Sequence, residues 1–243
     1  MPAITAETLA RLRAFDTPTI CNLIELFDVR PRHTGYLDAR IQAAFPDMPP
    51  VVGFAATATF RAAAPPRAGA SYASLAEQVE RFAELDGPAI VVFQDLDDPS
   101  AAATFGEVMC STYQAFGAVG LITSGTGRDL DQVRALGFPV FTNGTVCAHG
   151  YTHIPDVHVP VRVGGVAIHP NDLLHGDLNG VTTIPHAIAA EVADLGPAFV
   201  AAEQIVLQAV RSGSCTVAQL RAALAEMGAQ IAALRRQVTR RQS

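Results

Sequence analysis

GAVGLITSGTGRDLDQVRALGFPVF, residues 117–141, predicts a strand, a turn, a short helix and a second strand in succession. Residues 119–123 form an apolar run bounded by glycines, as in a buried strand, and residues 124–127 are typical of a turn. Apolar residues then recur at helical spacing, and Gly137 followed by Pro139 predicts the end of that helix. The stretch therefore predicts one strand–helix–strand unit of an α/β fold.

Arg128 and Asp129 follow the turn directly, where the chain leaves the predicted sheet. Loops positioned by a rigid sheet often carry functional residues, so this pair is a candidate site. Without further context, a salt bridge at the start of a helix is the favoured explanation of the pair.

The composition is that of a globular protein with one core. The chain has 243 residues, of which 49% are hydrophobic and 16% charged, and its formal net charge is -6. We expect a single domain, residues 1–243, and the acidic balance argues against nucleic acid or an anionic membrane as a partner. The chain shows no N-terminal signal peptide and no apolar run of about 18 residues, and its four cysteines are scattered without a CxxC pair. We therefore expect a cytoplasmic protein with reduced thiols.

All 17 cationic side chains are arginine, and the sequence has no lysine. A Schiff base on lysine, with a carbonyl substrate or with pyridoxal phosphate, is therefore excluded. Any carbon–carbon bond chemistry beside a carbonyl would need a metal ion to accept the electrons. The arginines near the C-terminus, at 235, 236, 240 and 241, favour a solvated helix end over a binding patch.

Apolar spacing and capping residues predict the remaining elements. We expect strands at 51–61, 89–93, 140–141, 157–168 (with a break at Gly164-Gly165) and 181–184, and helices at 5–14, from Thr17 to about 27, 71–85, 106–116, 186–194, 197–211 and 217–237. Pro197 is expected to divide the C-terminal helices, and Val108, Met109, Thr112 and Ala115 to form the buried side of the helix at 106–116. The helical C-terminal end, 186–243, is expected to pack on a neighbouring subunit.

Several segments together resemble the RraA-like family, over roughly residues 15–185. They are Gly106-Glu107, Gly120 through Asp129, Arg134 through Phe141, Pro160 through Gly165, Pro170 through Leu173 and Gly176 through Val181. That family includes regulators of RNase E activity and divalent-metal-dependent aldolases acting on 4-hydroxy-4-methyl-2-oxoglutarate. The string from Arg128 to Phe141 is the specific part of the match, because glycines alone would be weak evidence.

The resemblance implies an α/β fold, a three-layer β/β/α swivelling-domain sandwich with flanking N- and C-terminal helices, assembled as a homotrimer or a trimer-based hexamer. It also implies that Asp129 binds Mg²⁺ or Mn²⁺ and that Arg128 contacts the substrate oxo group. Glu107 would hold a water on the metal, and the backbone N–H groups of Glu107, Val108 and Met109 would receive the substrate carboxylate.

Physical chemistry agrees with these roles. A helix N-terminus presents unpaired N–H groups to an anion, which suits the carboxylate of a small 2-oxo acid. Magnesium prefers oxygen ligands and keeps several waters, so one direct carboxylate can suffice. Aldol cleavage and β-decarboxylation share an enolate, which a cation and a guanidinium would stabilise.

Some positions depart from the family pattern or stay open. Ser124 replaces an aspartate found in many relatives, which leaves its role undecided. His149 and His153 are predicted to contact the far end of a substrate, with a zinc site as the weaker alternative. His175 could lie in a surface turn or in a neighbouring site, and the acidic stretch Asp95 to Asp98 favours an exposed turn over a cation site.

Two further classes compete with the lyase. A non-enzymatic RraA-type regulator of ribonuclease activity would need a protein-binding surface but no metal. A methyltransferase is disfavoured, because the sequence has no strand followed by a glycine-rich loop that would hold the methyl donor.

Overall fold

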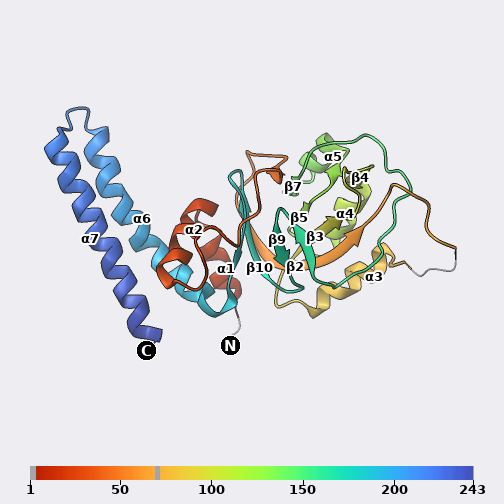
Figure 1. Ribbon diagram of the computed structural model, residues 1–243, viewed down its shortest axis with the longest axis horizontal. Coiled ribbons are helices and arrows are strands. Elements are labelled where there is room, and N and C mark those ends of the chain that lie inside the picture. The colour runs from red at the N-terminus through yellow and green to blue at the C-terminus, as the bar shows by residue number, and fades with distance from the viewer. Residues whose placement is uncertain (1–3, 69–71, 243) are drawn as a thin grey trace.

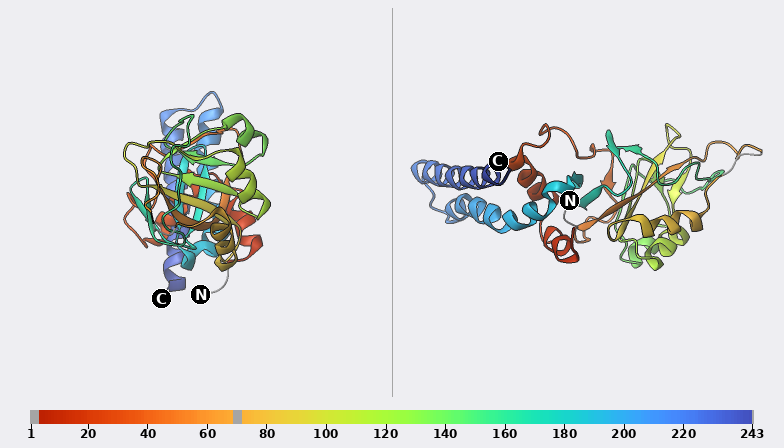
Figure 2. Two further views of the ribbon diagram at one scale, coloured as in Figure 1. Left: turned by 90° about the vertical axis from the view of Figure 1, so that its right-hand side faces the viewer. Right: turned by 90° about the horizontal axis from the view of Figure 1, so that it is seen from below.

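A computed structural model describes residues 4–68 and 72–242 of the chain (Figure 1). A mixed α/β body makes up one end of the molecule, and a hairpin of two long helices projects from it at the other (Figures 1 and 2). Both ends of the described chain lie on the helical side of the body.

The body is organised around a seven-stranded sheet in the order β1-β7-β5-β3-β2-β10-β11. The four central strands β7, β5, β3 and β2 run parallel, whereas β1 pairs antiparallel with β7 at one edge and the β10–β11 hairpin pairs antiparallel with β2 at the other. The sheet strands are β1 Gln42–Ala43, β2 Val51–Phe60, β3 Ala89–Asp95, β5 Gly120–Thr123, β7 Val140–Thr142, β10 Leu173–Asp177 and β11 Gly180–Ile184. Two short ribbons complete the strands: β4 Ala103–Phe105 with β6 Thr126–Gly127, and β8 Val161–Val163 with β9 Val166–Ile168.

Strand β2 shows how the layers form, because it is buried along its whole length. Phe54 packs with helices α1, α2 and α6, and Phe60 packs in the cluster that includes α4 and α5. Ala55, on the other face, packs in the cluster that contains the β8–β9 hairpin. Alternate residues of a strand point to opposite faces, so this strand separates a helical layer from a β layer. The predicted α/β sandwich with flanking helices is confirmed.

Capping residues set the N-terminal helices much as expected. The helices and 3₁₀ turns are α1 Ala6–Leu12, α2 Thr17–Ile24, η1 Glu25–Phe27, α3 Leu75–Glu80, η2 Arg81–Glu84, α4 Glu107–Ala115, α5 Leu130–Ala135, η3 His186–Ile188, α6 Ala189–Arg211 and α7 Val217–Gln242. Thr5 caps α1 as predicted, but Asp16 rather than Thr17 caps α2, since its carboxylate accepts the Thr19 N–H. An aspartate in this position is as effective a cap as threonine.

The predicted helix over 71–85 is shorter than its pattern suggested. Ser74 and Glu77 form a reciprocal capping box that starts α3 at Leu75, and η2 completes the segment. Residue 71, the predicted start, lies outside the described residues.

The buried side predicted for α4 is right at Met109, which packs against the core, and wrong at Val108 and Ala115, which are exposed. Cys110 and Tyr113 face the core, whereas Val108 is 75% exposed. Tyr113 also donates a hydrogen bond to Gln78 of α3, at 2.5 Å. The prediction placed the apolar side about one residue around the helix, because it did not count Cys110 and Tyr113 among the buried residues.

The alternating stretch 157–168 is a strand only in part. Gly164 and Gly165 both have positive φ and form the turn between β8 and β9, while residues 157–160 precede the hairpin. The break at the two glycines was predicted, and the continuous strand before them was not found.

Pro197 does not divide the C-terminal helices, so that prediction is wrong. Helix α6 is continuous from Ala189 to Arg211. A proline leaves the carbonyl four residues earlier without its helical partner. Here the Arg11 guanidinium donates to that carbonyl, Ala193 O, at 3.1 Å, so α1 satisfies the group that the proline leaves unpaired.

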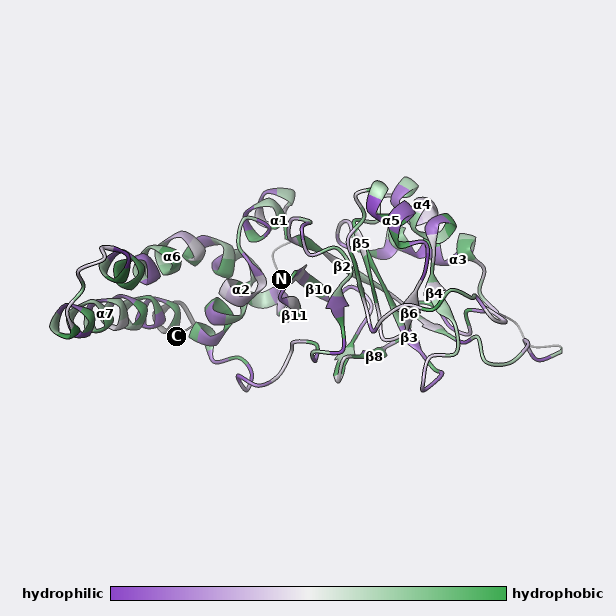
Figure 3. Ribbon diagram, turned by 90° about the horizontal axis from the view of Figure 1, so that it is seen from above, coloured by the Kyte–Doolittle hydropathy of each residue, from purple (hydrophilic) through white to green (hydrophobic). Residues whose placement is uncertain are grey.

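Hydrophobic residues alternate with hydrophilic ones along both helices of the C-terminal hairpin (Figure 3). Thr216 caps α7 through a reciprocal exchange with Gln219. Within residues 4–68 and 72–242, no helix is both long and apolar enough to cross a membrane.

Candidate functional site

The β4–β6 ribbon brings together the two segments that carry the predicted site. Ala103 pairs with Thr126 and Phe105 with Gly127. Glu107 begins α4 just after β4, and Arg128 and Asp129 follow β6 just before α5. Side chains that are about twenty residues apart in the sequence therefore meet at one edge of the body.

Asp129 links the two segments directly. Its Oδ2 accepts the backbone N–H of Glu107 at 3.1 Å and lies 3.6 Å from the Arg128 Nε. Gly106 allows this approach, since a Cβ there would lie 2.6 Å from the same carboxylate oxygen. A side chain at position 106 would therefore displace Asp129.

Asp129 also has an unusual backbone conformation. Its φ is 55° and its ψ 38°, in the left-handed region that aspartate tolerates better than most residues. It stands at the N-cap of α5, yet its side chain forms no capping hydrogen bond there and instead reaches the start of α4. Backbone strain of this kind is characteristic of functional sites.

The pair is open to solvent and is not closed into a tight salt bridge. The side chains of Arg128 and Asp129 are 34% and 37% exposed, and 3.6 Å exceeds a normal hydrogen-bond length. Beneath them, burial and the Asp129 charge raise the pKa of Cys110 to about 12, so that thiol stays protonated. The reactive groups of this site are therefore the carboxylate and the guanidinium.

The three backbone N–H groups predicted to bind an anion at the start of α4 differ in whether they already have a hydrogen-bond partner. The Glu107 N–H already donates to Asp129. The first helical bond of α4 runs from Cys110 N–H to Gly106 O, at 3.1 Å. The N–H groups of Val108 and Met109 precede that bond, as expected for the first turn of a helix, and they are the donors that can receive an anion.

The oxygen donors fit a hard cation that keeps most of its own water. Asp129 is about one-third exposed, and Glu107 is exposed beside it. In the part of the chain that the structure describes, no group of three or more His, Cys, Asp or Glu side chains could hold a metal ion. A site with a single direct carboxylate suits Mg²⁺ or Mn²⁺, and it does not suit a tetrahedral zinc centre.

His149 and His153 lie on the long loop after β7, away from helix positions. The His149 ring bonds to Gly150 O at 2.9 Å, and the His153 ring bonds to Tyr151 O at 2.8 Å and packs edge-on against Tyr72. Each ring thus has one nitrogen engaged with its own loop, and their predicted contact with a substrate stays a prediction.

His175 is neither in a surface turn nor near Asp129. It is fully buried in β10, with Nδ1 2.9 Å from the Thr17 hydroxyl and Nε2 3.2 Å from Leu12 O. Burial lowers the pKa of His175, and the Leu12 carbonyl requires a proton on Nε2. Neutral His175 therefore joins β10 to α1 and α2, together with Asp177, which accepts the Thr17 N–H.

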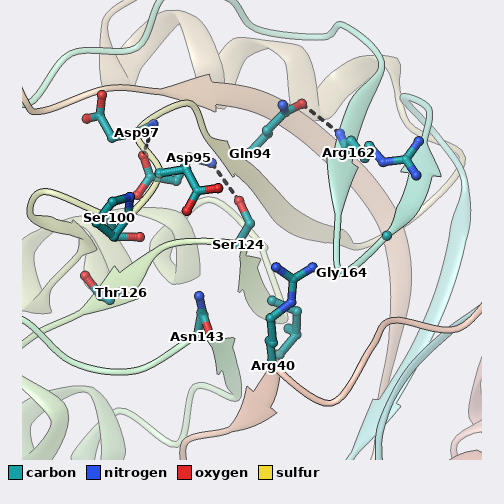
Figure 4. A pocket seen from close by; sticks show the side chains of 14 residues that line it. Arg40, Gln94, Asp95, Asp97, Ser100, Ser124, Thr126, Asn143, Arg162 and Gly164 are labelled. Carbon is teal, nitrogen blue, oxygen red and sulfur yellow. Dashed lines mark hydrogen bonds between the residues drawn. The ribbon is translucent and has the colours of Figure 1, made fainter.

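Ser124 lies in a separate polar cavity of about 530 Å³ at the carboxyl ends of β3 and β5 (Figure 4). Its hydroxyl accepts the Asp95 N–H at 2.9 Å, and Gln94 Oε1 accepts the Arg162 N–H at 2.7 Å. Ser124 thus has a structural contact here, while Asp97 accepts the N–H groups of residues 62 and 63. The expectation of an exposed turn over Asp95 to Asp98 is therefore wrong in part: Asp98 is exposed, but the Asp97 side chain is only 10% exposed because it binds this distant segment.

In this cavity Asp95 was considered from the sequence only as part of the acidic stretch, and Arg40 was not considered as a site residue. Asp95 Oδ2 is buried without a hydrogen-bond partner among the described residues, and burial raises its pKa. Arg40 is paired with Asp38 through two contacts of 2.9 and 2.7 Å. Only the fold places these groups on the same cavity, because they come from distant segments.

The chain belongs to the RraA-like family: residues 17–183 match its family model, described as Aldolase/RraA. A Halalkalibacterium halodurans protein named "Putative 4-hydroxy-4-methyl-2-oxoglutarate aldolase" is 36% identical over 99 residues, 40% of this chain and 47% of that protein. The chain spans about half or less of the length of the curated relatives it matches. The suspected family is therefore confirmed.

Two solved structures share the fold. Streptomyces coelicolor RraAS2, described as an unusual member of the RNase ES inhibitor RraA protein family, has a TM-score of 0.62 at 27% identity, over 78% of this chain and 91% of that one. An uncharacterized protein from Pseudomonas syringae has a TM-score of 0.71 at 24% identity, over 90% and 95% of the two chains, and this likeness concerns the fold alone.

Proposed function

We propose that this protein is a divalent-metal-dependent carbon–carbon lyase acting on a small 2-oxo acid. It would cleave a 4-hydroxy-2-oxo acid to release pyruvate, decarboxylate an oxaloacetate-type substrate, or do both. The two reactions break a bond to the carbon next to the carbonyl and share one enolate, so one site can serve both.

The observation that supports this proposal is the meeting of Asp129, Arg128 and the start of α4. The Asp129 carboxylate accepts the Glu107 N–H and lies 3.6 Å from the Arg128 Nε. The side chains of Arg128 and Asp129 are partly exposed to solvent, and Glu107 is exposed. The carboxylate can bind a cation, and the guanidinium can donate to an oxo oxygen. The N–H groups at the start of α4 can bind the carboxylate of the substrate.

Asp129 would hold Mg²⁺ or Mn²⁺ directly, with Glu107 next to it. A bound divalent cation supplies positive charge beside the substrate oxo group. The chain has no lysine that could serve as electron acceptor in its place.

The residues of the chain would divide the remaining work. The N–H groups of Val108 and Met109 bind the substrate carboxylate, and the positive end of the α4 dipole favours that anion. Arg128 donates to the 2-oxo oxygen, where negative charge develops as the C3–C4 bond breaks. Glu107 holds the water that takes the proton of the 4-hydroxyl and later returns a proton to C3 of pyruvate enolate.

A lone chain leaves this site uncovered, as the 75% exposure of Val108 indicates. We infer that a neighbouring subunit closes it in a homotrimer or a trimer-based hexamer, which would exclude water from the enolate. His149 and His153 are candidates for contacts with the far end of the substrate. The cytoplasmic location predicted from the sequence stays a prediction.

The experiment is pyruvate release from 4-hydroxy-4-methyl-2-oxoglutarate and from oxaloacetate, measured with Mg²⁺, with Mn²⁺ and after exhaustive chelation. Chelation should abolish release, and either cation should restore it. Asp131→Ala, two residues from Asp129 and exposed on α5, serves as the matched control. Release that survives chelation, or that Asp129→Asn leaves unchanged, would falsify the metal role.

The second candidate is a non-enzymatic regulator of ribonuclease activity, which the likeness to RraAS2 favours. Such a binder needs no cation at Asp129. Calorimetry separates the two: stoichiometric binding of Mg²⁺ or Mn²⁺ in the presence of pyruvate supports the lyase, and no binding under either condition supports the regulator.

A further inference from the structure

The polar cavity at the carboxyl ends of β3 and β5 has the position of a ligand site. Its volume of about 530 Å³ lies within the usual range for small-molecule pockets. In open α/β sheets, ligands bind in the crevice outside the carboxyl ends of the strands, and β3 and β5 are parallel neighbours. Glu107, Arg128 and Asp129 do not line this cavity, so it is separate from the site of the proposed reaction.

The wall of the cavity is polar over most of its surface (Figure 4). It is built from the end of β3 and the loop that follows, the turn after β5, the residue after β7, the β8–β9 turn and the segment before β1. Ile41 and Pro99 are the apolar side chains of this wall apart from glycine. Small-molecule pockets are usually lined by apolar and aromatic side chains. The wall therefore favours a ligand that carries polar groups on all sides.

Three uncharged side chains of the wall keep hydrogen-bonding capacity for a ligand. The Ser124 oxygen accepts the Asp95 N–H, which leaves the hydroxyl proton to donate. Gln94 accepts the Arg162 N–H through Oε1, which leaves its NH₂ group to donate. The exposed Asn143 amide points into the same space (Figure 4). Donors from β3 and from the turn after β5 thus converge on one cavity.

Asp95 supplies an acceptor at the inner end of the cavity. Its Oδ1 accepts the Asp97 N–H at 3.0 Å, whereas Oδ2 is buried without a hydrogen-bond partner among the described residues. A buried acceptor in this state costs free energy unless a donor reaches it. Burial raises the pKa of Asp95, and the Asp97 charge adds to that rise. A perturbed carboxyl group in a cavity is a common mark of a binding site.

The other charges near this carboxylate are already paired within the chain. The Arg40 guanidinium, which points into the cavity (Figure 4), contacts Asp38 at 2.9 and 2.7 Å through two of its three nitrogens. Asp97 lies 3.6 Å from the Arg61 Nε, and its Oδ2 accepts two backbone N–H groups. An anionic ligand would meet the carboxylates of Asp95 and Asp97, and a cationic ligand would meet Arg40. Both signs of charge on the wall therefore favour a neutral ligand.

We propose that this cavity binds a neutral polyhydroxylated molecule, a sugar or a sugar alcohol. A hydroxyl group donates one hydrogen bond and accepts others, so it matches a wall that offers both kinds of partner. One ligand hydroxyl donates to the Asp95 carboxylate. Neighbouring ligand oxygens accept from Ser124, Gln94 and the remaining nitrogen of Arg40. This site is independent of the reaction proposed at Asp129.

The first test titrates the chain with D-glucose, D-xylose and myo-inositol, followed by saturation-transfer NMR and calorimetry. We expect at least one of the three to bind with one-to-one stoichiometry. Asp95→Asn keeps the size of the side chain but replaces one acceptor oxygen by a donor, so it should weaken binding about tenfold or more. Asp131→Asn, the same change at an exposed position of α5, should bind as the wild type does. Asp129→Asn should also keep wild-type binding.

The second test closes the cavity with a large side chain. Asn143 is exposed at the rim, so Asn143→Trp should fill the space without removing a buried contact, and circular dichroism should be unchanged. Binding of the polyol should be lost. Thr145→Trp, two residues further on and outside this cavity, is the matched control and should bind normally.

Three outcomes would overturn the proposal. The first is that none of the three polyols binds at concentrations up to its solubility. The second is binding that both Asp95→Asn and Asn143→Trp leave unchanged. The third is tighter binding of glycine or pyruvate than of any polyol, lost in Asn143→Trp, because that result would assign the cavity to a charged ligand.

Discussion

Two polar clusters of this protein differ in how completely their groups are satisfied. At the edge of the body, Asp129 and Arg128 are about one-third exposed, and only one of the two carboxylate oxygens of Asp129 has a partner among the described residues. In the centre, His175 and Asp177 are buried, and both His175 ring nitrogens and both Asp177 oxygens are hydrogen-bonded. The first arrangement is suited to binding a ligand, and the second holds α1, α2 and β10 together.

The largest effect is expected at Asp129. Asparagine tolerates the left-handed backbone and keeps one oxygen, so Asp129→Asn should fold normally while losing the negative charge that holds a cation. We expect kcat/KM for pyruvate release to fall by about 1,000-fold or more, with little change in the denaturation midpoint. If Asp129→Asn lost both stability and activity, Asp129 would have a structural role like that of Asp177.

Arg128→Gln should reduce kcat about 100-fold, because it removes one charged donor from the developing negative charge. Stability should change by less than about 0.5 kcal/mol, since the side chain is part of a half-exposed ion pair. Steady-state kinetics and urea unfolding of the same preparation check both statements. Arg134→Gln, on α5 and more exposed, is the matched control.

Asp177→Ala should show the opposite pattern. It leaves the buried Thr17 N–H without an acceptor, which costs about 2 kcal/mol of unfolding free energy. The activity per folded molecule should stay within about twofold of wild type, because the cluster only supports the fold. Urea unfolding and active-site titration measure the two quantities, with the exposed Asp98→Ala as the comparison.

The smallest of the expected effects concerns His175, which should make the stability of the protein depend on pH. Its folded pKa lies below the usual value of 6.5, so the unfolded chain binds the extra proton first as the pH falls below 6.5. Stability should therefore decrease below pH 6.5, by at most about 1.4 kcal/mol per pH unit from this group, until the folded pKa is reached. His175→Gln should remove that contribution. An unchanged pH profile in the variant would show that His175 titrates normally.

The sequence predicted the family, the α/β fold and the segments that meet at the site. Glycine turns, capping residues and the string from Arg128 to Phe141 are local signals, and they were sufficient because each depends on residues close in the chain. The errors arose where a distant partner decided the outcome. Pro197 stays inside α6 because Arg11 satisfies the carbonyl that the proline leaves free, and α4 buries Tyr113 because Gln78 accepts its hydroxyl proton.

What the sequence determined by itself is the chemistry available: arginine without lysine, and Glu107, Arg128 and Asp129 next to turn glycines. What only the tertiary structure decided is which of these groups are free to act. The β4–β6 pairing brings the Asp129 carboxylate to the Glu107 N–H and leaves that carboxylate partly exposed to solvent. By contrast, His175 is buried in the sheet and is hydrogen-bonded to Leu12 and Thr17. Burial and hydrogen bonding depend on neighbours that lie far apart in the chain, and so the fold, rather than local sequence, separates a site from a core contact.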